Sequence, residues 1–91
     1  DTPMALIGTI YGDWRGGPEG APSISVEMKP DGAGYVAVVV RTGLADDSVA
    51  AIKDVLHIIM DRGGNWFVAS ATQHRKCYRT GLFEWTAKPC P

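Results

Sequence analysis

Alternation of apolar and polar residues predicts the first strand over residues 23–29, where three aliphatic side chains share one face. The valine-rich run 34–42 is strongly β-prone, because branched side chains pack well on a pleated sheet. Pro30-Asp31-Gly32 separates the two runs, and its proline and glycine are typical of a tight turn. The two segments therefore predict an antiparallel hairpin.

Residues 46–60 fit two interpretations. Apolar positions three and four residues apart are typical of a helix that one of two adjacent aspartates would cap, and apolar positions on alternate residues are typical of a strand. The glycine-rich sequence 61–65 is typical of a hairpin turn, and the alternating stretch 65–74 after it needs a partner close by. We therefore predict strands over 51–61 and 65–74, with a helix over 46–60 as the alternative to the first strand.

The N-terminal residues carry the signals of a short helix. Thr2 suits the N-cap and Pro3 suits the first helical position. Apolar residues between Leu6 and Trp14 then fall on one helical face, whereas the glycines and isoleucines of this stretch leave an irregular strand as the alternative. With the helix, the chain is predicted to be one α+β domain over 1–91, a four-stranded antiparallel meander with a short N-terminal helix covering one face. An all-β fold is the alternative.

Charge is unevenly distributed along the 91 residues, although the net charge is only −1. Residues 1–61 hold nine acidic residues against four basic ones, and residues 62–91 hold five basic residues against a single glutamate. This basic C-terminal third is too weakly charged for a dedicated nucleic-acid binder. No apolar run approaches the roughly 20 residues that a transmembrane helix needs. We therefore expect no nucleic-acid partner and no transmembrane segment.

The two cysteines, Cys77 and Cys90, lie near the end of the chain on either side of a polar, glycine-containing stretch. A disulfide between them would contribute on the order of 3 kcal/mol of stability and would indicate an oxidising compartment. Two unpaired thiols of a cytosolic protein are the alternative. The chain begins at Asp1 without a methionine or an apolar leader, which is typical of a processed form. We therefore predict the disulfide and a periplasmic or secreted protein.

The sequence lacks the motifs that carry catalysis. No serine lies in a Gly-x-Ser-x-Gly elbow, and the paired glycines lack the context of a phosphate-binding loop. His57 and His74 have no second ligand at a metal-binding spacing, and Asp46-Asp47 suits a turn or cap better than a metal pair. We therefore predict that the protein is not an enzyme and has no metal and no cofactor.

Basic and aromatic residues gather in the segment that the disulfide would close. Arginine, tyrosine and tryptophan often anchor interfaces, and a closed loop loses less entropy when it binds. A solvated basic turn, with the tryptophan packed over the core, is the alternative. The candidate binding residues are His74, Arg75, Lys76, Tyr78, Arg79 and Trp85.

Two patterns in roughly the second half of the chain are Gly43-Leu44-Ala45-Asp46-Asp47-Ser48-Val49 and Trp66…Arg75-Lys76-Cys77…Gly81…Trp85-Thr86…Pro89-Cys90-Pro91. They resemble a small family of exported bacterial proteins of unknown function. In that family a DDSV segment leads into a hairpin, and a tryptophan and a Cys-bounded C-terminal loop follow. The resemblance implies export, the disulfide and the strand interpretation of 51–61. It implies no activity and no catalytic residue.

Together these observations predict a non-catalytic binding domain of the bacterial cell envelope. It would contact a protein or an anionic polymer through the basic C-terminal loop. The alternative is an inhibitor of a secreted hydrolase, which would insert the loop 77–90 or 15–22 into an active site. We expect a monomer, although an unpaired strand edge at 23–29 or 65–74 would suit an edge-to-edge dimer.

Overall fold

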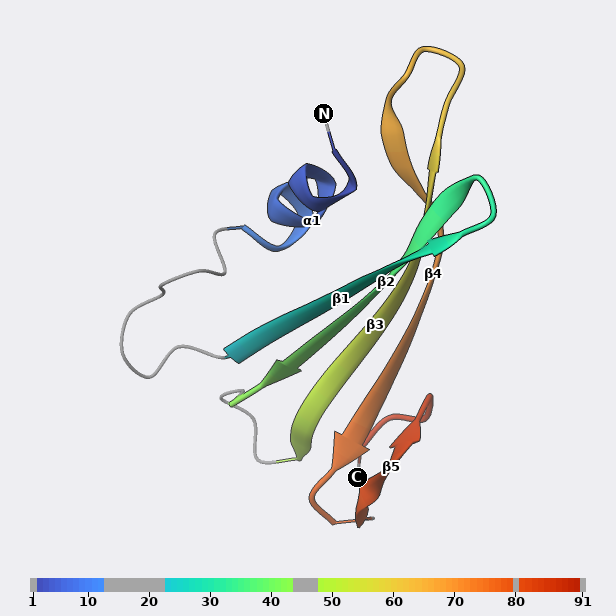
Figure 1. The fold of residues 1–91 in the computed structure, drawn as a ribbon. Coiled ribbons are helices and arrows are strands. Elements are labelled where there is room, and N and C mark those ends of the chain that lie inside the picture. The colour runs from blue at the N-terminus through green and yellow to red at the C-terminus, as the bar shows by residue number, and fades with distance from the viewer. Residues whose placement is uncertain (1, 13–22, 44–47, 80, 91) are drawn as a thin grey trace.

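The computed structural model describes residues 2–12, 23–43, 48–79 and 81–90, apart from the side chains of 81–83. It contains one helix and one antiparallel sheet whose strand order follows the chain (Figure 1). The elements are α1 (Pro3–Tyr11), β1 (Ser23–Asp31), β2 (Gly34–Thr42), β3 (Val49–Met60), β4 (Trp66–Cys77) and β5 (Gly81–Thr86). The structure is therefore mostly antiparallel sheet with one short helix, as the α+β interpretation expects.

The prediction of four strands is wrong, because the structure has a fifth strand, β5, at Gly81–Thr86. The sequence predicts this segment as part of the loop that the disulfide closes. β5 pairs with the end of β4, where Arg75 lies opposite Thr86 and Cys77 lies opposite Gly81, and the register shifts between these two pairs. The aromatic and aliphatic residues of the segment are β-prone, but the strand is short and begins at a glycine, so its alternation is weak.

The first turn of α1 forms as the capping residues predict. The Thr2 hydroxyl oxygen accepts a hydrogen bond of 3.1 Å from the backbone N–H of Ala5, with proline in the first turn. The helix ends earlier than the predicted stretch to Trp14, which lies outside the described residues. Its last residue is Tyr11, and Gly12 follows with a φ of 76°, a left-handed conformation that suits glycine.

α1 packs on one face of the sheet, and the register shows which side chains share that face. Val39 lies opposite Asp54 and Ala37 lies opposite Leu56, so these four residues project to the same side. The buried core on this side consists of Ile7 from the helix with Ala37, Val39, Leu56 and Ile58 from the sheet. We call this side the helix face and the other side the open face.

Gly34 marks a place where β2 runs unusually close to β3. An added Cβ at this position would overlap the backbone carbonyl oxygen of Ile58. We therefore expect Gly34→Ala to lower the free energy of unfolding by about 1–3 kcal/mol, measured by urea denaturation. Gly8→Ala is the matched control, because nothing lies within 4 Å of a Cβ there, and alanine should stabilise the helix by about 0.5–1 kcal/mol. Equal effects of the two substitutions would contradict the close approach.

Candidate functional site

Two lysine side chains converge on one tryptophan ring on the open face of the sheet. The Lys53 Nζ atom lies 4.8 Å from the centre of the Trp85 ring, and the Lys76 Nζ atom lies 4.7 Å from it. Ammonium groups at this distance are attracted to the negative face of an indole. Trp85 is half-buried at this position, so its ring has a defined place in the fold.

Strand register brings these residues together from three strands. Lys53 of β3 lies directly opposite His74 of β4, and Ala51 lies opposite Lys76, so the two lysines are diagonal neighbours on the open face. Thr86 of β5 lies opposite Arg75, which projects to the helix face. Its neighbour Trp85 therefore projects to the open face, beside Lys76. We call Lys53, His74, Lys76 and Trp85 the basic cluster.

The positive charge of the basic cluster has no counterion among the described residues. The ion pairs found there join Glu27 to Lys29, Asp54 to Arg41 and Asp31 to His57, and none of them includes Lys53 or Lys76. The Nδ1 atom of His74 is buried and has no hydrogen-bond partner in the part of the chain that the structure describes. Two uncompensated ammonium groups held close together create a local positive potential that attracts anions.

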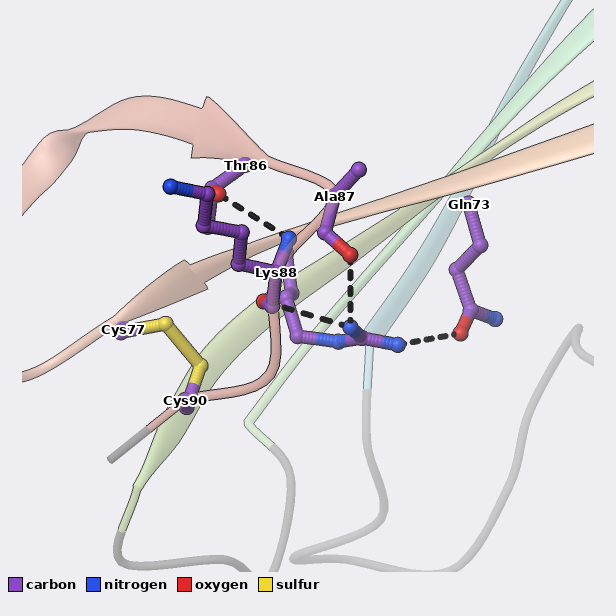
Figure 2. The surroundings of a disulfide bond; sticks show 7 residues. Gln73, Cys77, Thr86, Ala87, Lys88 and Cys90 are labelled. Atoms are coloured by element: carbon purple, nitrogen blue, oxygen red, sulfur yellow. Dashed lines mark hydrogen bonds between the residues drawn. A yellow bond between two sulfur atoms is a disulfide. The ribbon is translucent and has the colours of Figure 1, made fainter.

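Arg75 lies apart from the cluster because alternate residues of a strand face opposite sides. Its guanidinium donates a hydrogen bond of 2.9 Å to the Gln73 side-chain oxygen on the helix face. It also donates to the backbone carbonyl groups of Ala87 and Lys88, at 3.4 and 3.3 Å (Figure 2). Arg75 therefore fastens the C-terminal tail to the sheet instead of presenting its charge on the open face.

Tyr78 and Arg79 lie in the turn that follows β4, and both are exposed. The backbone N–H of Tyr78 donates a hydrogen bond of 3.0 Å to the Ser48 carbonyl, which anchors the start of this turn. The six predicted binding residues thus occupy three places: His74, Lys76 and Trp85 on the open face, Arg75 on the helix face, and these two in the turn. Lys53 joins the first group, although the sequence analysis did not single it out.

The predicted disulfide between Cys77 and Cys90 is present, with a Cα–Cα distance of 5.3 Å (Figure 2). Cys77 is the last residue of β4 and is only 1% exposed, so the bond joins the tail to the buried end of a strand. Arg75 and the disulfide hold the residues after β5 at two separate points. The chain that follows β5, the strand of Trp85, is therefore fixed to β4 at both of these points.

A buried polar network on the helix face centres on Asp54, which the sequence pattern alone did not indicate. This carboxylate accepts hydrogen bonds from the Tyr11 hydroxyl at 2.5 Å, the Arg41 Nη2 atom at 3.0 Å and the Gln73 amide nitrogen at 2.8 Å. Burial, together with this carboxylate, raises the pKa of Tyr11 well above its ordinary value. An acidic residue at a core-facing strand position is the signal that would have indicated such a network.

The described part of the chain contains no group of three or more His, Cys, Asp or Glu side chains arranged to hold a metal ion. Within the same residues no helix is long and apolar enough to cross a membrane. No family model, curated protein or solved structure matches this chain. Its function is therefore inferred from its own residues.

Proposed function

We propose that this chain is a non-catalytic binding domain of the bacterial cell envelope that binds an anionic polymer through the basic cluster. The observation that carries the proposal is the convergence of two ammonium groups on the Trp85 ring with no carboxylate partner among the described residues. Such a site gains Coulomb energy from an anion without first breaking an ion pair.

The preorganisation of the cluster supports binding. A free lysine side chain loses considerable rotamer entropy when it is immobilised by a ligand. Contact with the Trp85 ring restricts Lys53 and Lys76 before any ligand arrives, which lowers that cost. Tyr78 and Arg79 lie in the turn between β4 and β5 and extend the basic and aromatic surface at this end of the sheet.

The chemistry of lysine favours a polymer over one defined acidic group. An ammonium is a compact point charge that accepts anions from many directions, whereas the planar guanidinium of arginine selects a bidentate geometry. The arginine nearest to the cluster, Arg75, is occupied by the tail. Point charges of this kind suit repeated anionic groups. The disulfide and the resemblance to exported bacterial proteins support an envelope location for the encounter.

Charge reversal tests this proposal. We expect Lys53→Glu with Lys76→Glu to weaken binding to dextran sulfate at least tenfold, because two attractive contacts become repulsive. Lys29→Glu with Arg62→Glu makes the same change in net charge at exposed positions outside the cluster and should change the affinity less than twofold. The measurement is a fluorescence titration at two salt concentrations. Circular dichroism should show that both variants keep the wild-type fold.

Two results would contradict the proposal. An equal loss of affinity in both double variants would mean that net charge, and no particular surface, governs binding. Binding to an acidic protein surface but not to any sulfate, phosphate or carboxylate polymer would mean that the ligand of the basic cluster is a protein.

A further inference from the structure

A small pocket lies between α1 and the residues where β4 begins. The turn that joins β3 to β4 is at the end of the sheet opposite β5, the strand that carries Trp85 (Figure 1). The cavity volume of the pocket is about 160 Å³, and it is lined by Thr2, Ala5, Leu6, Thr9, Asn65 and Trp66. Trp66 is the first residue of β4 and Asn65 directly precedes it. The other four lining residues are the N-cap Thr2 and three residues of α1. None of the lining side chains carries a charge, which distinguishes this pocket from the basic cluster.

Two threonine hydroxyls at the pocket can still form hydrogen bonds with a ligand, one as a donor and the other as an acceptor. The Thr2 oxygen accepts from the backbone N–H of Ala5, so its own proton is free to be donated. The Thr9 hydroxyl donates to the backbone carbonyl of Ala5 at 3.1 Å, so its lone pairs are free to accept. The helix thus offers one donor and one acceptor, about two turns apart along its length.

Asn65 is held in place by the turn before it. Its backbone N–H donates a hydrogen bond of 2.9 Å to the Asp61 carboxylate. This bond is the main reason why the pKa of Asp61 lies below its ordinary value, and the Asn65 side-chain amide and the Gly63 N–H act in the same direction. With its amide N–H turned to Asp61, the side-chain carbonyl of Asn65 remains as an acceptor for a ligand.

Trp66 supplies an aromatic surface whose position is set by the core. Its ring packs edge-on against the Tyr35 ring, with the ring centres 5.5 Å apart, and it lies against the core cluster around Ile7. Its indole N–H has no hydrogen-bond partner among the described residues. A ring held in this way needs no rearrangement to meet the apolar face of a ligand.

We propose that this pocket binds a neutral sugar residue. A pyranose has one face of C–H groups that can lie against an indole, and its hydroxyls both donate and accept hydrogen bonds. The pocket offers the matching set: an aromatic ring from Trp66, a donor from Thr2, and acceptors from Thr9 and Asn65. None of the lining side chains supplies a cationic partner for an anion. This site is separate from the basic cluster and does not depend on it.

The test is a titration of the ¹⁵N-labelled protein with a chito-oligosaccharide and with a malto-oligosaccharide, followed by ¹H–¹⁵N spectra. We expect at least one of them to cause saturable shifts in the Trp66 indole N–H and the Asn65 amide, while the Trp85 indole N–H stays in place. Dextran sulfate should do the reverse, shifting the Trp85 signal alone. The two signals therefore separate a failure of the sugar site from a failure of the basic cluster.

Thr9→Val removes a hydroxyl at an exposed helix position without changing the shape of the side chain much. Loss of one hydrogen bond to the ligand should weaken sugar binding roughly fivefold. Thr72→Val makes the same chemical change at an exposed position on the open face and should leave the affinity unchanged. The proposal is overturned if neither sugar shifts the Trp66 signal, if the Trp85 signal moves equally, or if Thr9→Val binds like the wild type.

Discussion

Replacing Asp54 with alanine is expected to lower the free energy of unfolding by about 3 kcal/mol, which is a large part of the stability of a small domain. Asp54 is 7% exposed. Its carboxylate accepts hydrogen bonds on the helix face from Tyr11, Arg41 and Gln73. Without the carboxylate, the partly buried Arg41 guanidinium would have no counterion among the described residues, where its Nε atom already lacks a hydrogen-bond partner. Chemical denaturation of the variant measures this loss directly.

Asp31→Ala is the matched control for this prediction, because Asp31 is exposed and its nearest basic partner, His57, is 3.7 Å away. A substitution at an exposed position of this kind should change the free energy of unfolding by no more than about 0.5 kcal/mol. A loss below about 1 kcal/mol for Asp54→Ala would mean that the network is not a structural centre of the fold.

Asp54→Asn gives a second readout of the same network through Tyr11. The folded pKa of Tyr11 lies above its unfolded value, so the neutral phenol contributes stability that is complete below the unfolded pKa and is lost as the pH rises above it. Removal of the negative charge at position 54 should bring the Tyr11 pKa down. Ultraviolet titration of tyrosinate, with Tyr11→Phe to assign the late transition, measures the change. An unchanged Tyr11 titration in the asparagine variant would contradict the coupling.

Removal of the disulfide, as Cys77→Ala with Cys90→Ala, is expected to cost about 3 kcal/mol and to lower the Tm by about 10 °C or more. The bond closes a segment with a sequence separation of 13 and holds the tail that follows β5. β5 pairs with β4 alone and lies at the edge of the sheet, so this strand should open first. Faster amide hydrogen exchange in β5 than in β2 would show this.

The same variant links stability to the proposed function. Trp85 reaches the open face only while β5 is paired with β4, so loss of the disulfide should also weaken binding to dextran sulfate. The wild-type protein treated with a reductant provides the control, because it should show the same Tm and the same affinity as the double variant. Tight polymer binding by a variant whose β5 exchanges freely would contradict the role of Trp85.

Local signals were sufficient for most of the elements. The alternation in 23–29, the turn residues after it and the Thr2–Pro3 pair each act within a few residues, so they predict a strand, a turn and a helix start without tertiary contacts. The strand predicted over 51–61 is confirmed as β3, Val49–Met60, and the signal that favoured it over a helix is the hairpin turn that follows. β5 was missed because it is a short strand that begins at a glycine, so its own alternation is weak.

The candidate site shows where local signals end. The sequence by itself determined that basic and aromatic residues gather near two cysteines that pair, and that most of the chain is strand. Only the tertiary structure decided that Lys53 joins Lys76 and Trp85 on the open face, and that Arg75 turns away to hold the tail. The physical reason is register: a shift of one residue moves every side chain of a strand to the opposite face, and the register of β3 with β4 and of β4 with β5 shifts at irregularities that the sequence pattern does not mark.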